Sequence, residues 1–292
     1  MMKLGIQMFS VKNMMMENPL MALKVVSEVG YKYIETAVMP PPPGQAPDLG
    51  MGFGISAGEM KRLLNDYGVK AIGSHAFFPD MEVMKARLDY QKEVGVSTIG
   101  AAASFFADED DVKQQCELFN KVGEMSKQLG IRFYYHNHFH EFQKMNGKTV
   151  YDIMLENTDP DLVFFELDTY WAVRAGMDPV QVMDQLGKRL IMLHQKDLPA
   201  DYDQPINLFD GAVDANSKIT METFMGMFMS NPAHGQGFTE VGTGTLPIQS
   251  YIDKANKLEV EYIILEQDFT KLGEIESITY SMEAFKKYKG VE

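Results

Sequence analysis

The sequence predicts a single-domain (β/α)8, or TIM, barrel that spans residues 1–292. Eight short apolar runs alternate with longer segments of helical periodicity, and this alternation is typical of a parallel sheet. Eight such units close into a barrel, a fold of about 250 residues. A doubly wound open sheet is the alternative. It usually has about six strands and a Gly-rich phosphate loop after the first strand, and no such loop occurs here.

Glycines mark the ends of four expected helices, at Gly30, Gly68, Gly95 and Gly130. A glycine just past a helix adopts the left-handed conformation at little cost. An apolar run starts within a few residues of each one, and the spacing of roughly 30 residues is the size of one βα unit. No linker interrupts the series, so we expect one domain.

The expected elements follow from these patterns. The strands are Leu4–Phe9, Tyr33–Thr36, Lys70–His75, Thr98–Ala101, Arg132–His136, Leu162–Asp168, Leu190–Lys196 and Tyr262–Gln267. The helices are Pro19–Val29, Ala57–Tyr67, Glu82–Glu93, Asp110–Leu129, Val150–Asn157, Pro179–Leu186, Pro247–Leu258 and Glu274–Tyr288. Long loops are expected at Met39–Ile55, which includes four consecutive prolines, at Leu198–Lys218 and at Ser230–Thr245. Long loops that follow barrel strands belong at the C-terminal face, where such barrels place their sites.

Composition excludes some classes of function. The formal net charge of −14 disfavours nucleic acid as a partner, because phosphate binding needs a basic surface. An anionic substrate stays possible, because a bound metal inverts the local charge. The single cysteine, Cys116, cannot form an internal disulfide, which fits a reducing, cytoplasmic compartment. We expect no membrane partner, since no leader pattern and no apolar run of about 18 residues occurs. A homo-oligomer remains open.

A histidine cluster lies at the end of the fifth expected strand. His136, His138 and His140 alternate there, and Glu141 follows at once. Alternating residues of a strand share one face. Imidazoles beside a carboxylate can bind a divalent metal or transfer protons near neutral pH. A core strand with hydrogen-bonded histidines is the purely structural interpretation.

Titratable residues also end the other apolar runs, and a barrel would bring them to one pocket. The candidates are Glu35, His75, His138, Glu141, Asp168, His194, Lys196 and Glu266. Burying an isolated carboxylate costs several kcal/mol unless the group is paired or binds a metal. Carboxylates with one imidazole suit Mn²⁺, Mg²⁺, Co²⁺ or sometimes Zn²⁺. For each residue alone, an ion pair at the barrel rim is the alternative.

Six segments along the chain carry a family resemblance: Leu4–Val11, Tyr135–Phe142, Glu166–Trp171 with Gly176–Pro179, Leu193–Asp197, Val241–Gly244 and Leu265–Asp268. In this order they resemble the sugar isomerase/epimerase superfamily (sugar phosphate isomerases/epimerases) with the xylose-isomerase-like barrel. The resemblance implies a divalent-metal site formed by a carboxylate after strand five together with Asp168, His194 and Glu266.

The chain departs from that pattern at strand five. Many relatives carry the metal-binding Glu there in a Glu-Asn-His-like sequence, and this chain has His136-Asn137-His138 instead. Either Glu141 reaches the metal or His136 replaces the carboxylate. We favour Glu141, because the Tyr-His-Asn-His-x-x-Glu-Phe pattern resembles enzymes that act on 3-keto sugars and C-glycosides. In that branch His138 would transfer the proton.

The resemblance implies proton transfer beside a carbonyl group through an enediolate, with a metal that stabilises the developing charge. His138 or a metal-bound glutamate, Glu141 or Glu266, would remove the α-proton. Lys196 would hydrogen-bond the enediolate oxygen or a hydroxyl group, or else form a salt bridge to Asp168 or Asp197.

Further contacts to a sugar substrate are expected from His75, His136, Trp171 and Lys196. For Trp171, packing at the barrel rim is the alternative. Reprotonation of the enediolate gives isomerisation or epimerisation, whereas loss of a β-substituent gives inosose dehydration or cleavage of a 3-keto-glycoside. The sequence does not choose among these outcomes. A non-catalytic sugar-binding subunit is disfavoured by the unbroken ligand set. An endonuclease with a related barrel would need more metal ligands and a basic face.

Overall fold

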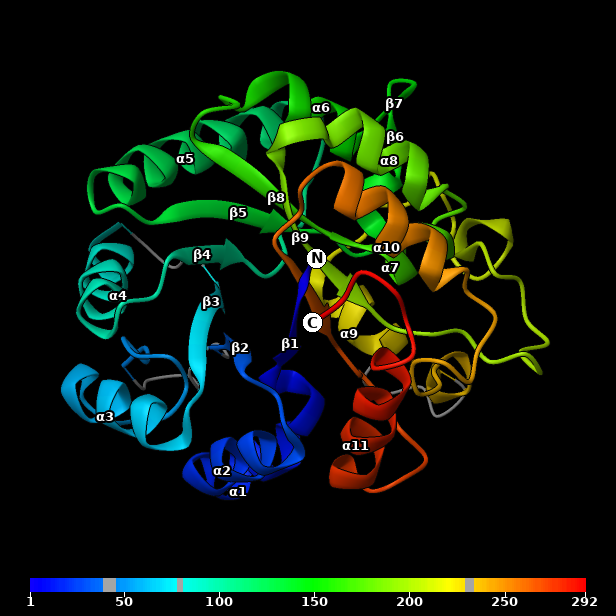
Figure 1. The fold of residues 1–292 in the computed structure, drawn as a ribbon. Coiled ribbons are helices and arrows are strands. Elements are labelled where there is room, and N and C mark those ends of the chain that lie inside the picture. The colour runs from blue at the N-terminus through cyan, green and yellow to red at the C-terminus, as the bar shows by residue number, and fades with distance from the viewer. Residues whose placement is uncertain (39–45, 78–80, 229–233) are drawn as a thin grey trace.

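A computed structural model, which describes residues 1–38, 46–77, 81–228 and 234–292, shows a closed barrel of eight parallel strands with helices around it (Figure 1). Neighbouring strands follow the order β1-β10-β9-β8-β5-β4-β3-β2. The predicted (β/α)8 barrel is therefore confirmed. The two ends of the chain meet near the barrel axis, where Met2 forms a parallel bridge with Val291.

The barrel strands are β1 (Lys3–Gln7), β2 (Tyr33–Ala37), β3 (Lys70–Ala76), β4 (Thr98–Ala101), β5 (Arg132–His136), β8 (Val163–Asp168), β9 (Leu190–Gln195) and β10 (Tyr262–Leu265). A separate small hairpin consists of β6 (Lys144–Met145) and β7 (Lys148–Thr149). The helices are α1 (Lys12–Glu17), α2 (Pro19–Val29), α3 (Ala57–Tyr67), α4 (Met81–Val94), α5 (Glu109–Gln128), α6 (Val150–Asn157), α7 (Thr169–Arg174), α8 (Pro179–Leu186), α9 (Met221–Phe228), α10 (Ile248–Lys257) and α11 (Glu274–Phe285). None of the helices in the described ranges is long and apolar enough to cross a membrane.

Most expected elements lie where the sequence placed them, and α2, α3, α6 and α8 match to the residue. Gly30 and Gly68 end α2 and α3 in the left-handed region, with φ of 114° and 66°. The first strand stops at Gln7 instead of Phe9, because the Gln7 side chain accepts a hydrogen bond from the Phe9 N–H and starts a 3-10 turn.

Three helices were not expected. These are α1, α7 and α9. Helix α7 follows β8 without a loop, because the Asp168 carboxylate caps it by accepting a hydrogen bond from the Trp171 N–H at 2.8 Å. Of the long loops, residues 39–45 of the proline-rich segment and 230–233 of the Gly-rich segment lie outside the described residues.

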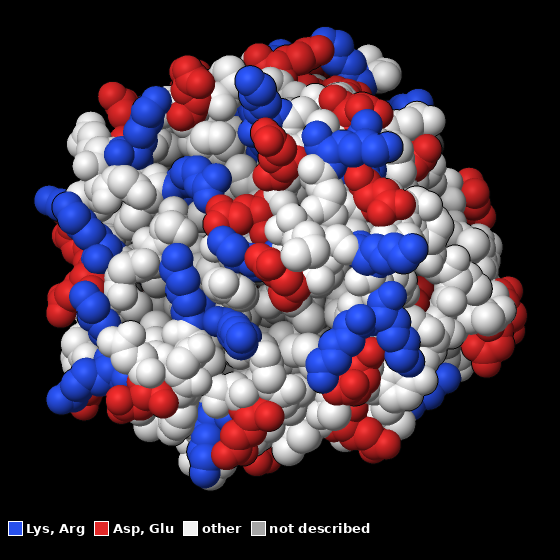
Figure 2. All heavy atoms as spheres, in the orientation of Figure 1, with Lys and Arg blue, Asp and Glu red and all other residues white. Residues whose placement is uncertain are grey.

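The barrel interior changes from apolar to polar along each strand. Tyr134 and Met192 belong to a buried apolar cluster, and two residues later their strands present His136 and His194. Residues two apart share one face of a strand, so the polar side chains lie inside the barrel above the apolar ones. On the surface that faces the viewer in Figure 2, at one end of the barrel, basic and acidic side chains are interspersed.

Asp197, which is 1% exposed, connects the segment that follows β9 to the loop before α10 through hydrogen bonds. Its carboxylate accepts backbone hydrogen bonds from Leu198, Gly242, Gly244 and Leu246 at 2.9–3.1 Å. The residue next to Lys196 thereby joins β9 to the Gly-rich loop before α10.

We expect Asp197→Ala to lower the free energy of unfolding by on the order of 3 kcal/mol, because several enclosed N–H groups lose their acceptor at about 1–3 kcal/mol each. Urea denaturation measures the change. Asp201→Ala, at an exposed position of the same segment, is the matched control. Equal stability of the two variants would contradict the anchoring role.

Candidate metal centre and active site

Four titratable side chains converge at the C-terminal ends of the barrel strands. His136 ends β5, Asp168 ends β8, His194 lies in β9 and Glu266 directly follows β10. One potential ligand atom from each of them lies within 4.8 Å of the others. We call these four residues the strand-end group. They are buried, and Glu266 is the most accessible at 6%.

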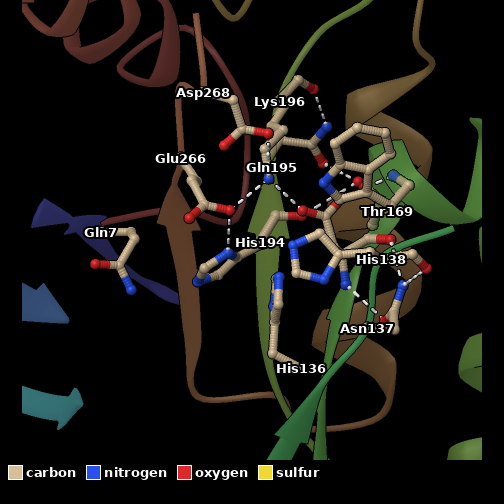
Figure 3. A network of polar contacts seen from close by, with 12 residues as sticks. Gln7, His136, Asn137, His138, Thr169, His194, Gln195, Lys196, Glu266 and Asp268 are labelled. Atoms are coloured by element: carbon tan, nitrogen blue, oxygen red, sulfur yellow. Dashed lines mark hydrogen bonds and ion pairs between the residues drawn. The ribbon is translucent and has the colours of Figure 1, made fainter. Parts of the chain in front are cut away.

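Lys196 supplies the positive charge next to this group (Figure 3). Its ammonium group forms ion pairs with the Asp168 Oδ2 and Glu266 Oε2 atoms, and it lies 3.8 Å from Asp268 Oδ2. A buried pair of carboxylates requires a cation, and here the ammonium takes that place. The donor set of two carboxylates and two imidazoles fits a divalent metal ion at the same position.

The His194 ring is held by carboxylates on both sides. Nδ1 lies 2.9 Å from Glu266 Oε2, and Nε2 lies 2.6 Å from Glu35 Oε2 and 3.1 Å from Glu166 Oε1. Burial lowers the pKa of His194, but Glu166, Glu266 and Glu35 outweigh this effect and hold it well above its usual value. A carboxylate behind the ring orients a metal-binding histidine, so Nδ1 is the nitrogen that faces the strand-end group.

Metal affinity is therefore expected to depend on pH in a particular direction. A metal ion must displace a proton from His194, so affinity is full above the raised pKa and falls as pH decreases through it. The loss should begin at a higher pH than for an ordinary histidine, whose pKa is about 6.5. Mn²⁺ titration calorimetry across the neutral range measures the effect. Glu35→Gln should move the dependence to lower pH, whereas a flat profile in the wild type would refute the coupling.

The neighbouring carboxyl groups differ in pKa. Burial raises the pKa of Asp168, and Lys196 offsets this only in part. Burial also favours a higher pKa for Glu266, but Lys196 and His194 outweigh this effect and hold its pKa well below the usual value. Burial raises the pKa of Asp268 to about 7, with Lys196 opposing. Deprotonated Glu266 is thus paired with the Lys196 ammonium.

Glu141 does not join the strand-end group, contrary to our preferred expectation. Its Oε1 accepts a hydrogen bond from the Tyr135 hydroxyl at 2.7 Å, and its Oε2 accepts one from the His138 N–H at 2.9 Å. The chain makes a 3-10 turn over His140–Phe142, which folds the carboxylate back onto its own strand. His136, the alternative ligand, takes the position beside the other three.

His138 lies beside the strand-end group, next to His136 and Trp171. Ring centroids are 4.9 Å apart for His138 and His136 and 5.8 Å apart for His138 and Trp171, and Phe224 of α9 packs on the ring edge-to-face at 5.0 Å. Burial, with His136 and His140 nearby, lowers the pKa of His138 well below its usual value. The ring is therefore neutral at physiological pH and has a lone pair available.

The residues expected to bind substrate fall in two places. Trp171 borders the strand-end group, with its ring centroid 5.9 Å from Lys196 Nζ. His75 lies deeper in the barrel, where its Nε2 is 2.7 Å from Glu166 Oε2. Glu166 is a further residue of this region, and the sequence alone did not predict it. The position of Glu166 in the sequence, two residues before Asp168 and therefore on the same face of β8, could have identified it.

Comparison with known proteins agrees with this architecture. The family model described as xylose isomerase-like TIM barrel matches residues 23–287. Inosose dehydratases of Clostridium tetani and Clostridium perfringens are similar over part of their length. The first is 30% identical over 93 residues, which is 32% of this chain and 30% of that protein, and the second is 26% identical over 135 residues, 44% of each. The chain thus aligns with less than half the length of these curated relatives.

Solved structures match over nearly the whole chain. A sugar phosphate isomerase/epimerase from Parabacteroides distasonis superposes with a TM-score of 0.73 at 24% identity, covering 100% of this chain and 96% of that one. The zinc-bound IOLI protein superposes with a TM-score of 0.68 at 15% identity, covering 97% and 96%. At such identities the structural matches establish the fold. Together with the family model, they show that this chain belongs to the xylose isomerase-like TIM barrel family.

Proposed function

We propose that this protein is a divalent-metal-dependent sugar isomerase or epimerase that acts on a sugar or keto-sugar through an enediolate. The observation that carries the proposal is the convergence of two carboxylates and two imidazoles at four strand ends, with a lysine ammonium between the carboxylates. A divalent ion bound there would act as a Lewis acid toward the substrate carbonyl group and favour negative charge on its oxygen.

The side chains have separate proposed roles. His136, Asp168, His194 and Glu266 hold the ion. Neutral His138, which lies beside them, is the proposed base for the proton next to the carbonyl group.

Lys196 would donate a hydrogen bond to the oxygen that becomes negative. Its ammonium group is available for this role, because Asp168 and Asp268 outweigh the effect of burial and raise its pKa above the usual value. Trp171 would offer an apolar face to the sugar ring. The proposed partner is a small sugar, and the buried single thiol of Cys116 fits action in a reducing cytoplasm.

A lyase or dehydratase is the second candidate, and the similarity to inosose dehydratases favours it. Both reactions start with removal of the same α-proton. They differ in the next step, where a β-substituent leaves instead of a proton returning. The surroundings of the leaving group then decide the outcome.

Incubation with Mn²⁺ and a panel of keto-sugars, keto-glycosides and inososes in deuterated water separates the candidates. Deuterium in an isomerised or epimerised product supports the first proposal, and an unsaturated or cleaved product supports the second. If none of the panel exchanges an α-hydrogen while the protein binds Mn²⁺, both reactions are excluded for these substrates, and a sugar-binding role becomes the better proposal.

A further inference from the structure

A second cluster of histidines and glutamates lies deeper in the barrel than Lys196. His75, His136, Glu166 and His194 each offer a ligand atom within 4.8 Å of the others, and all four are buried. We call these residues the floor group. The three imidazole rings pack against one another, with centroids 4.7 Å apart for His75 and His136, 5.3 Å for His75 and His194, and 4.5 Å for His136 and His194.

Glu166 is at the centre of the floor group. Its Oε2 lies 2.7 Å from His75 Nε2 and 3.3 Å from His136 Nδ1, and its Oε1 lies 3.1 Å from His194 Nε2. Four ligand atoms around a tetrahedral ion with bonds of about 2.1 Å lie roughly 3.4 Å from one another. The His136 and His194 nitrogen atoms lie near this distance from a Glu166 oxygen, and His75 Nε2 is closer because it hydrogen-bonds with that carboxylate.

Two atoms of the floor group lack a hydrogen-bond partner among the described residues. They are His136 Nδ1 and Glu166 Oε1, on side chains that are 1% and 0% exposed, and each makes only the ion-pair contact of 3.3 or 3.1 Å given above. Buried polar atoms are nearly always satisfied, so each of these needs an explanation. A second carboxylate adds to the need for a cation, because Glu35 Oε2 lies 3.4 Å from His75 Nε2.

We propose that the floor group is a second divalent-cation site, with His75, His136, His194 and Glu166 as ligands. Three imidazoles and one carboxylate favour Zn²⁺ or Co²⁺ over Mg²⁺, which prefers oxygen ligands. The site is fully enclosed, as structural metal sites are, whereas the strand-end group borders Lys196 and the residues proposed to contact substrate.

The two groups face opposite edges of the His194 ring. Nδ1 points to Glu266 of the strand-end group, and Nε2 points to Glu166 of the floor group. A neutral imidazole has a single lone pair, so ions at both groups would require His194 to lose both ring protons and bridge them as an imidazolate, whereas a zinc ion in the floor alone would bind Nε2 and leave the proton on Nδ1. His136 and His194 belong to both groups, so the two sites share these ligands, but the floor site does not depend on the proposed reaction.

Zinc binding to a variant of the full-length protein tests the site. The double variant Asp168→Asn with Glu266→Gln removes both carboxylates of the strand-end group and no residue of the floor group. We expect it to bind one equivalent of Zn²⁺ in equilibrium dialysis. Adding His75→Gln should weaken that binding by about 10–100-fold or more. Removal of a residue that only hydrogen-bonds to a metal ligand already has an effect of this size. His140→Gln in the same double variant is the comparison, because His140 belongs to a third group of possible ligands with His138 and Glu141. Unchanged affinity in that variant assigns the ion to the floor group, whereas an affinity lost there and not with His75→Gln overturns the proposal.

Crystallography of the unmutated protein gives an independent answer if a variant does not fold. Anomalous scattering from Zn²⁺-soaked crystals should place an ion within about 2.0–2.2 Å of His75 Nε2 and of a Glu166 oxygen. An ion only between Asp168 and Glu266 would overturn the proposal, as would a double variant that binds no Zn²⁺ or whose affinity His75→Gln leaves unchanged.

Discussion

His138→Asn is expected to lower turnover by roughly 10²–10⁴-fold, the usual share of general acid–base catalysis, while the fold and the metal affinity are kept. The ring lies beside His136 and Trp171, and its lowered pKa keeps it unprotonated before the reaction. Exchange of the substrate α-hydrogen with deuterated water should slow in proportion. Both quantities are measured on the substrate that the panel identifies.

His140→Asn is the matched control for this variant. His140 belongs to the same segment, but its Nε2 lies 2.9 Å from the Ser104 carbonyl oxygen and its ring stacks on Phe105. Turnover should therefore change little. If His138 instead only positions the proposed ligand His136, against which its ring packs, the His138→Asn variant would lose metal affinity, and saturating metal would restore its rate. Full activity at ordinary metal concentration would exclude both roles and leave Glu266 or Glu141 as the base.

His136→Gln is expected to weaken Mn²⁺ binding more than about 100-fold. Loss of a residue that only hydrogen-bonds to a metal ligand already costs about 10–100-fold in affinity. The reason is its place beside Asp168, His194 and Glu266, where it would bind the ion directly. The same substitution should abolish metal-dependent turnover. Titration calorimetry at a pH above the raised His194 pKa gives the affinity without interference from protonation.

Glu141→Gln is the variant to compare with His136→Gln, since these residues were the two candidates for the strand-five ligand. The amide oxygen of Gln can accept the hydrogen bond from the His138 N–H, and its NH2 group can donate to the Tyr135 hydroxyl oxygen, so the fold should be kept. We expect near-normal Mn²⁺ affinity. The opposite pattern, with affinity lost in Glu141→Gln and retained in His136→Gln, would show that the turn over His140–Phe142 opens when metal binds.

The sequence by itself was sufficient for the barrel and for much of the strand-end group. Gly30 and Gly68 mark helix ends locally, because the left-handed conformation depends on the residue itself. Asp168 and His194 each end an apolar run, and in a parallel barrel all strand ends lie at one rim. Their convergence therefore followed from the fold class.

Only the tertiary structure showed which of His136 and Glu141 lies beside the other three residues of the strand-end group. Both residues are at or just after the end of β5, and sequence spacing does not say in which direction the chain turns there. In the turn that returns Glu141 to Tyr135, His140 contacts Ser104 and Phe105, which come from another βα unit.

The floor group likewise depends on tertiary structure. Glu166 and His75 are 91 residues apart, and they meet because β3 and β8 present their inward faces across the same closed barrel. The lowered pKa of His138 and the raised pKa of His194 have the same origin. Burial and carboxylates from distant strands set them, and these neighbours exist only once the barrel has closed.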